Sequence, residues 1–461
     1  MRPDLPRPRH GADSALLALY ARRAVPRYTS YPTAPHFEKN FPEDIYRSWL
    51  AALDPAEPVS LYVHIPFCKQ MCWYCGCNMK LIARYQPVRT YVDNLCAEIA
   101  LVAAQLPARM AVAHLHFGGG TPTAVHPEDL EKIVRTIEAL FDFTPGAERA
   151  IETDPRTITD EMIARIDALG FTRASLGVQE FDPTVQAAIN RIQPAALVQK
   201  TTEKLRAAGV KGINYDLIYG LPQQTEVALC KTVEECLAMK PDRVVLFGYA
   251  HVPWMAKNQR MIDEAALPGA EERAAQARLS AQALVAGGYQ PIGIDHFALP
   301  DDSLAKAARE GRLHRNFQGY TDDDARSLIG FGATSIGRTP FGYVQNQSET
   351  GAWARAIEAG HLPVSKGLAM SVDDCLRGYV IERIMCDGAV NLEAAAAFFD
   401  VEPDWYLPEN EQLDILQRDG LITREGARLT LTPAGATLAR VVAATFDTYL
   451  LRDRARHSVA V

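Results

Sequence analysis

The sequence predicts an α/β fold, a partial (β/α) barrel of parallel strands with an extended arm before it and a mainly helical domain after it. Between residues 59 and 295, apolar β-branched segments alternate with helical patterns. Such alternation indicates a parallel sheet, and six or more repeats are typical of a full or partial barrel. Polar or glycine-rich segments recur at one end of these strands, where barrel chemistry collects. Beyond about residue 365 helical patterns dominate.

Composition limits the class of protein. The chain has 461 residues, 48% of them hydrophobic, and a net charge of −8. This size allows two or three domains, and the negative charge argues against a general nucleic-acid binder. No stretch approaches the roughly 18 apolar residues of a membrane span. The short apolar run 15–21 is followed by arginines and is not typical of a signal peptide, so we expect a cytoplasmic protein.

Residues 1–55 are expected to form an N-terminal arm. Residues 2–10 are rich in proline and arginine, and residues 26–37 hold three prolines and three aromatic residues. Prolines restrict the residues before them to extended conformations, so we predict an extended segment lying on a surface. An ordinary packed arm and an arm that contributes to an active site both remain open.

The catalytic domain is expected at residues 56–350. Its predicted strands are 59–65, 111–117, 150–153, 173–178, 212–219, 243–249 and 290–295. Its predicted helices include 87–104, 127–141, 195–208, 226–239, 270–286 and a charged helix at 303–312. A small-residue turn at 328–337 and a final short strand at 343–346 complete this domain.

The first strand leads into a loop that carries Cys68, Cys72, Cys75 and Cys77. The first three have the spacing C-x3-C-x2-C, which can reach three corners of a cubane iron–sulfur cluster and leave one iron open. Structural zinc usually takes a second cysteine pair, and the other five cysteines are scattered. Zinc without iron or sulfide in the purified protein would nevertheless favour that alternative.

Two other strand ends carry candidate ligand groups. The glycines 118–120 allow the backbone to approach a ligand closely, although a tight turn explains them equally well. Their spacing is not that of a dinucleotide-binding fingerprint. Glu152 ends another strand and could bind ribose hydroxyls. An ion pair with Arg156 or Arg173 is the alternative for Glu152.

A C-terminal domain is expected at residues 365–461. A helix beginning near Ser371, a helix at 410–417, a hairpin at 421–432 and a last helix at 433–449 resemble a winged-helix module. Such modules often bind DNA, but this segment lacks a basic stripe. We therefore expect a structural or substrate-covering role.

Several motifs together resemble the radical S-adenosylmethionine (SAM) enzymes and, among them, the family of oxygen-independent coproporphyrinogen III oxidases. They are PRYTSYPTA, YVHIPFC with the following CGCN, HFGGGTPT, IETDPR, GVQEF, YDLIYGLPQQT, GYAHVP, DHFALPDD and HRNFQGYT. The resemblance runs from Pro26 to about Arg454. It implies that a 5′-deoxyadenosyl radical drives oxidative decarboxylation of two propionates of coproporphyrinogen III, giving protoporphyrinogen IX in haem biosynthesis.

The same resemblance implies roles for individual residues. Cys68, Cys72 and Cys75 would hold a [4Fe–4S] cluster, and Tyr62 and Cys77 would serve catalysis, with Cys77 not a cluster ligand. Two molecules of SAM would bind. The first would be lined by Tyr62, Gly119, Glu152 and Ile336. The second would be lined by Tyr74, Gly120, Thr121, Gln179, Arg191, Asp216 and Ala250.

The resemblance also implies partners. Electrons would come from a flavodoxin or ferredoxin-type reductant and leave to an outside acceptor. We also expect a monomer and, from the net negative charge, no nucleic-acid partner. Arg27 and Arg315 are our candidates for binding the substrate's propionates. The nearest alternative is a haem chaperone of the same fold. Those relatives lack the extra cysteine and the PRYTSYPTA arm, so Cys77 and residues 26–34 favour the oxidase.

Overall fold

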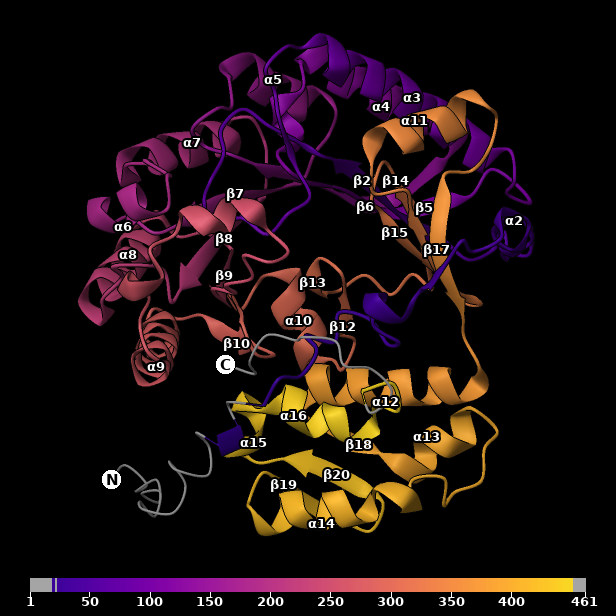
Figure 1. Cartoon of the computed structure of the whole chain (residues 1–461), viewed down its shortest axis with the longest axis vertical. Coiled ribbons are helices and arrows are strands. Elements are labelled where there is room, and N and C mark those ends of the chain that lie inside the picture. The colour runs from indigo at the N-terminus through magenta and orange to yellow at the C-terminus, as the bar shows by residue number, and fades with distance from the viewer. Residues whose placement is uncertain (1–18, 21–22, 451–461) are drawn as a thin grey trace. The chain divides into compact units, whose positions relative to one another are not determined.

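The structure is a computed structural model that describes residues 19–20 and 23–450 (Figure 1). The expectations for residues 2–10 and most of 15–21 lie outside these residues. The chain divides into two compact units. One unit is His36–Ser371, and the other joins the described residues up to Pro35 with those from Val372 onward. No helix among the described residues is long and apolar enough to cross a membrane.

The larger unit is built on one mixed sheet whose centre is parallel. Seven neighbouring strands, in the order β14-β2-β5-β6-β7-β8-β9, run parallel to one another. Their bounds are Ser327–Phe331 (β14), Val59–Ile65 (β2), Ala111–Gly119 (β5), Asp142–Thr153 (β6), Arg173–Gln179 (β7), Gly212–Tyr219 (β8) and Arg243–Gly248 (β9). Six of these strands confirm sequence predictions, and the parallel core confirms the α/β class.

Helices cover the outer side of these strands, as Figure 1 shows. They are α3 (Gln86–Ala103), α4 (Pro127–Leu140), α5 (Asp160–Ala168), α6 (Pro183–Ala188), α7 (Ala195–Ala207), α8 (Glu226–Met239) and α9 (Ala270–Ala286). In α4 the buried residues Leu130, Ile133, Val134 and Ile137 follow helical spacing and join the core. Five of the six predicted helices are thus confirmed here, whereas the sequence did not reveal α5 and α6.

The seventh predicted parallel strand is wrong. Residues 290–295 contain β10 (Gln290–Ile292), which turns back at Gly293 into β11 (His296–Ala298). Both contacts of β11 are antiparallel. Parallel pairing needs a crossover of a dozen or more residues, and the turn here is far shorter. Gly293 has a φ of +58°, which suits a tight reversal.

The small-residue turn predicted at 328–337 is also wrong as a single turn. It contains β14, a short connection, and β15 (Ile336–Thr339), which pairs antiparallel with β14. The strand predicted at 343–346 is confirmed as β16 (Gly342–Asn346) but is not the last. The helix α11 (Thr350–Glu358) and β17 (Val364–Ala369) follow it.

The predicted arm is not extended throughout. β1 (Glu38–Lys39) pairs with β17, and α2 (Glu43–Ala51) begins with two acidic residues that suit a helix N-terminus. The remaining elements of the larger unit are β3 (Phe67–Cys68), β4 (Lys80–Leu81), α10 (Ser303–Arg309), β12 (His314–Asn316) and β13 (Gly319–Thr321), with short 3-10 turns at Pro122–Ala124, Lys257–Met261 and Glu264–Ala266. A further 3-10 turn, Ala34–His36, spans the boundary between the two units in the sequence.

The smaller unit packs helices around a three-stranded antiparallel sheet, β18-β20-β19. Its elements are α12 (Val372–Asp387), β18 (Ala389–Asn391), α13 (Leu392–Phe398), a 3-10 turn (Leu407–Glu409), α14 (Asn410–Arg418), β19 (Ile422–Glu425), β20 (Arg428–Leu431), α15 (Pro433–Thr437), α16 (Ala439–Ala443) and a final 3-10 turn (Ala444–Phe446). The predicted helix 410–417 and the predicted hairpin are confirmed. The continuous last helix is wrong, because α15 ends at Thr437 and the following Leu438 has a φ of −115°, outside helical geometry, before α16 begins.

Two tyrosines of the PRYTSYPTA segment are buried in this smaller unit. Tyr28 donates to Asp447 at 3.0 Å, and Tyr31 stacks edge-on against Tyr449. These contacts favour the packed-arm interpretation for both tyrosines.

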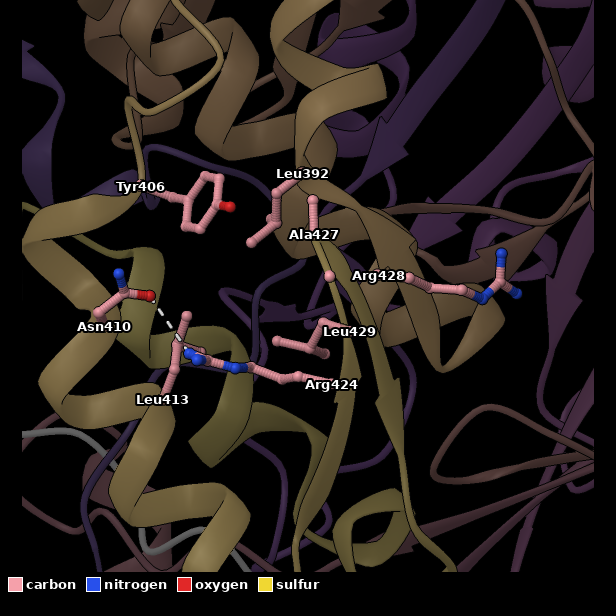
Figure 2. Close-up of a pocket in the computed structure, with 9 residues that line it drawn as sticks. Leu392, Tyr406, Asn410, Leu413, Arg424, Ala427, Arg428 and Leu429 are labelled. Atoms are coloured by element: carbon pink, nitrogen blue, oxygen red, sulfur yellow. Dashed lines mark hydrogen bonds between the residues drawn. The ribbon is translucent and has the colours of Figure 1, made fainter.

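A cavity of about 110 Å³ also lies in the smaller unit, beside α14 and the β19–β20 hairpin (Figure 2). Its Arg424 donates to Asn410 at 3.2 Å and pairs with Asp414 at 3.0 Å. Because this guanidinium already has two partners within the chain, we assign no ligand to the cavity.

Candidate active site

The candidate residues gather where the central parallel strands end. The register sets Ile65 beside Gly119 and Gly177 beside Asp216, which aligns the carboxyl ends of β2 with β5 and of β7 with β8. The cysteine loop follows β2 directly. Ligand sites of parallel α/β folds lie at this edge, because the loops from several strands converge there.

Amide side chains from distant segments hold the cysteine loop. The Asn258 Nδ2 group donates to the carbonyl oxygens of Cys72 (3.1 Å), Trp73 (3.2 Å) and Cys75 (2.8 Å). Gln259 donates to the Tyr74 carbonyl at 2.7 Å, and Asn190 donates to the Met71 carbonyl at 2.7 Å. These donors fix the backbone that presents the thiols. Sequence reasoning missed all three amides, because single polar residues in loops carry no pattern.

The three predicted ligand thiols differ in environment. Cys68 contacts the Thr121 hydroxyl at 3.4 Å, and burial raises its pKa to about 11. Hydrogen bonding from the Cys77 thiol and N–H, against the effect of burial, lowers the pKa of Cys75 to about 7. Cys72 is buried and receives two guanidinium contacts. All three sulfurs therefore have donors beside them.

The donor set fits a cluster better than a single ion. Among residues 19–20 and 23–450, no three His, Cys, Asp or Glu side chains converge on a point where one metal ion could sit. In a [4Fe–4S] cluster each thiolate binds a different iron, so the sulfurs need not converge. Positive and N–H groups near these thiols match the negative charge that such a cluster brings.

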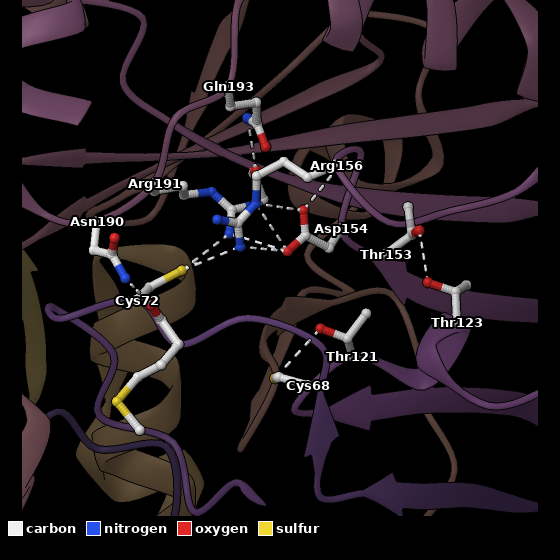
Figure 3. A network of polar contacts seen from close by, with 12 residues as sticks. Cys68, Cys72, Thr121, Thr123, Thr153, Asp154, Arg156, Asn190, Arg191 and Gln193 are labelled. Atoms are coloured by element: carbon white, nitrogen blue, oxygen red, sulfur yellow. Dashed lines mark hydrogen bonds and ion pairs between the residues drawn. The ribbon is translucent and has the colours of Figure 1, made fainter. Parts of the chain in front are cut away.

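A buried charge cluster lies beside Cys72 (Figure 3). Asp154 pairs with Arg156 at 2.6 Å and with Arg191 at 3.3 Å. Arg156 Nη2 lies 3.3 Å from Cys72 Sγ, and Arg191 Nη1 lies 3.4 Å from the same sulfur. Burial would raise the pKa of Asp154, but the two guanidiniums outweigh it and hold that pKa below its usual range. The sequence suggested Arg191 only by resemblance and gave no role to Asp154.

Glu152 does not form the predicted alternative ion pair. Arg156 pairs with Asp154, and Arg173 pairs with Glu148 at 2.8 Å, so that interpretation is wrong. Instead Glu152 accepts the Gly119 N–H at 3.1 Å and lies 3.4 Å from His116 Nε2. The Glu152 side chain is 38% exposed, so part of it remains accessible to a ligand.

The glycine segment is explained by close packing within the chain. Gly119 has a φ of +115°, and a Cβ there would lie 2.7 Å from the His64 ring. A Cβ on Gly120 would lie 2.8 Å from the Phe67 carbonyl oxygen. A Cβ on Gly118 would lie 3.0 Å from both Glu152 and Tyr62. Close packing within the chain therefore accounts for these glycines, two of which belong to β5, and Tyr62, Gly119 and Glu152 lie together.

The remaining candidates lie on or after neighbouring strands. The Tyr62 hydroxyl contacts His64 Nδ1 at 3.0 Å. Burial, helped by the charge of Glu152, raises the pKa of Asp216 to about 7. Gln179 ends β7 with a φ of +68°, and the Ala250 carbonyl accepts from Gln259 at 3.1 Å.

Three further candidates are less closely tied to this group. Ile336 begins β15, which is separated from β2 by β14. The Arg315 guanidinium lies 4.4 Å from the centre of the Tyr320 ring. Arg27 is exposed and belongs to the smaller unit.

Comparison with known proteins agrees with this geometry. Residues 62–236 match the radical SAM superfamily, so the fold and the site define a radical SAM enzyme. The chain is 46% identical to oxygen-independent coproporphyrinogen III oxidase of Bradyrhizobium diazoefficiens over 97% of this chain and 99% of that protein. It is 40% identical to the protein of the same name from Synechocystis, over 95% of each chain. The chain belongs to the oxygen-independent coproporphyrinogen III oxidase family.

A solved structure supports the same family assignment. Coproporphyrinogen III oxidase from Escherichia coli, described as a radical SAM enzyme, superposes with a TM-score of 0.88 at 37% identity. The alignment covers 92% of this chain and 97% of that one. The similarity thus extends well beyond the segment that carries the cysteines.

Proposed function

We propose that this protein converts coproporphyrinogen III to protoporphyrinogen IX by oxidative decarboxylation of two propionates. The observation that carries this proposal is the near-complete match to oxygen-independent coproporphyrinogen III oxidases, at 46% identity over 97% of the chain. The site supports it, because three thiols with adjacent donors follow the first central strand. The reaction belongs to haem biosynthesis.

Cys68, Cys72 and Cys75 would hold a [4Fe–4S] cluster. When bound, this cluster would supply the electron for reductive cleavage of SAM, and the cofactors would thereby provide the radical chemistry that acts on a propionate side chain. The chain's own residues position the reactants and exclude water. Asn258 fixes the loop backbone, and the Cys77 N–H donates to Cys75 Sγ at 3.4 Å. We assign Cys77 and Tyr62 to catalysis rather than to cluster binding.

Two SAM molecules would bind at the strand ends. Tyr62, Gly119 and Glu152 lie together and would hold the first, where the partly exposed Glu152 carboxylate would accept hydrogen bonds from ribose hydroxyls. Ile336 would complete this site. The second molecule would lie against the residues of the neighbouring strands and loops. These are Tyr74, Gly120, Thr121, Gln179, Arg191, Asp216 and Ala250.

The substrate carries four propionates, so a chain of net charge −8 needs local cations to bind it. Arg27 and Arg315 are our candidates. Unchanged substrate affinity in both Arg27→Ala and Arg315→Ala would exclude them. Electrons would come from a flavodoxin or ferredoxin-type donor. We further propose that the protein is cytoplasmic, because reduced thiols are maintained in that compartment, and that it is a monomer.

We also propose that three segments of the chain have different roles. Residues 1–55 act as an N-terminal arm, residues 56–350 carry the partial barrel and the chemistry, and residues 365–461 form a winged-helix-like domain of structural role. The three-stranded sheet with flanking helices α14 and α15 supports the last assignment.

The test is an anaerobic assay of reconstituted protein with SAM, a reductant and coproporphyrinogen III. We expect protoporphyrinogen IX, with SAM consumed. Tight haem binding without decarboxylation would instead identify a haem chaperone. Near-stoichiometric zinc without iron or sulfide would contradict the proposed cofactor.

A further inference from the structure

We propose that Arg156 and Asp154 are positioning residues that set the reduction potential of the iron–sulfur cluster through the sulfur of Cys72. This inference rests on the cluster of the proposed function. It concerns two residues outside the assigned ligand and SAM positions. The three side chains come from the cysteine loop and from the residues directly after β6.

The geometry fixes Arg156 against the sulfur. Its Nη2 group donates to Asp154 Oδ2 at 2.6 Å and to Cys72 Sγ at 3.3 Å. Its Nε group donates to the same carboxylate at 3.0 and 3.2 Å. Asp154 also accepts the Arg156 backbone N–H at 3.0 Å. The carboxylate thus holds both the backbone and the guanidinium of Arg156 in one orientation.

The charges are shielded from water. The Arg156 side chain is 5% exposed and the Asp154 side chain is 11% exposed. Arg191 brings a second guanidinium, 3.4 Å from Cys72 Sγ. Two guanidiniums and one carboxylate leave one net positive charge beside the sulfur. An arginine stays protonated at every working pH, so this charge is permanent.

A permanent positive charge at a cluster ligand has a definite consequence. Adding one electron makes the cluster more negative, so a nearby cation stabilises the reduced state and raises the potential. Hydrogen bonds to the ligand sulfur act in the same direction. Removing Arg156 should lower the potential, whereas neutralising Asp154 should raise it. A purely structural role predicts no such opposition of sign.

The experiment is a redox titration of the anaerobically reconstituted full chain with dithionite, followed by the electron paramagnetic resonance signal of the reduced cluster. Arg156→Gln should reduce the equilibrium constant for one-electron reduction about tenfold, a shift of about 59 mV to lower potential. Asp154→Asn should shift the potential upward. Arg156→Lys keeps the charge and should lie closer to the wild type than Arg156→Gln.

Arg149→Gln is the matched control. Arg149 lies on β6, the strand that precedes Asp154 and Arg156, about 13 Å from the end of that strand at about 3.3 Å per residue, and pairs with Glu138 at 2.8 Å. Its substitution should leave the potential unchanged. Equal potentials, or shifts of one sign in Arg156→Gln and Asp154→Asn, would overturn this inference. If Arg156→Gln loses its cluster, the reduction potentials of Asp154→Asn and Arg156→Lys test the inference instead.

Iron and sulfide analysis separates the two proposals. If the wild-type protein holds four irons per chain but Arg156→Gln and Asp154→Asn do not shift the potential in opposite directions, only the charge effect is overturned. Wild-type protein that holds no iron under reconstitution would overturn the proposed function together with this inference.

Discussion

Glu98 is a carboxylic acid with almost no access to water. It lies on α3, is 1% exposed, and accepts hydrogen bonds from Gly332 N (2.8 Å), Asn346 Nδ2 (2.5 Å) and Trp353 Nε1 (3.1 Å). It thereby ties α3 to the turn after β14, to β16 and to α11. Burial raises its pKa to about 8, although these donors act in the opposite direction. In the sequence, this glutamate looks like any solvent-facing residue of a helix.

The raised pKa of Glu98 predicts a pH dependence of stability. An unfolded glutamate has a pKa near 4.3, so the folded protein binds this proton more tightly. The stabilisation is complete below about pH 4.3 and is lost as the pH rises through about 8. Glu98→Gln should therefore flatten the dependence of the unfolding free energy between pH 5 and 8.5, measured by urea denaturation of the full chain.

Two further variants make this test specific. Glu98→Ala should lose about 1–3 kcal/mol of stability for each buried donor left without a partner. Glu203→Gln changes an exposed glutamate of α7 and should keep the wild-type pH profile. Parallel profiles for wild type and Glu98→Gln would show that Glu98 is ionised at all these pH values.

The position of Cys77 predicts that its substitution impairs turnover without loss of the cluster. It is exposed, and its N–H donates to Cys75 Sγ, so it lies beside a predicted ligand, and we propose that it is not itself a ligand. Cys77→Ser should retain wild-type iron and sulfide while turnover falls at least tenfold. Cys75→Ser should lose the cluster. Iron and sulfide analysis with the anaerobic assay measures both.

The control for these serine variants is Cys230→Ser. Cys230 lies on α8, outside the cysteine loop, and should affect neither quantity. Loss of iron–sulfur absorbance in Cys77→Ser would show that the site has four ligands.

At the scale of elements, strands with strong apolar runs were predictable and short connections were not. β2 and β8 have the predicted bounds because both are buried and bounded by turn residues. The reversal at Gly293 was missed, because a run of suitable residues does not specify the direction of pairing. α5 and α6 are too short for a clear helical period.

The cysteine loop depends on an element that the sequence did not assign to it. Asn258 lies on the 3-10 turn Lys257–Met261 and supplies one amide to three loop carbonyls. Asn258→Asp keeps the shape of the side chain but removes the donor and places a carboxylate against carbonyl oxygens. We expect at least a threefold faster loss of iron to a chelator, measured by absorbance under anaerobic conditions.

Asn94→Asp provides the control for this element. Asn94 is partly exposed on α3 and donates to Glu358 at 3.4 Å, outside the loop. Its iron should leave at the wild-type rate. Equal rates in Asn258→Asp and wild type would mean that the loop keeps its shape without this amide.

At the scale of the whole molecule, the site was predictable where its residues are contiguous. The three cysteines and the glycine segment each occupy a short stretch of sequence, so their spacing is visible. The contacts that organise these segments are not visible in the sequence. Arg156 lies 84 residues from Cys72, and Asn258 lies 186 residues from it. Only the folded sheet brings such segments together, and no local sequence pattern reveals a contact between residues so far apart in the chain.

The number of SAM molecules bound per chain tests whether the strand ends form one SAM site or two. If the site near Tyr62 and Glu152 and the site near Gln179 and Asp216 both bind, the cluster-loaded chain should bind two SAM by anaerobic equilibrium dialysis. Glu152→Gln removes a charged acceptor, whose hydrogen bonds contribute about 1.5–3 kcal/mol, so one site should weaken at least tenfold. The other should keep its affinity. Because Glu131 lies on the outer helix α4, Glu131→Gln should bind two SAM normally. One SAM per wild-type chain would exclude a second site, and equal weakening of both sites would place Glu152 between them.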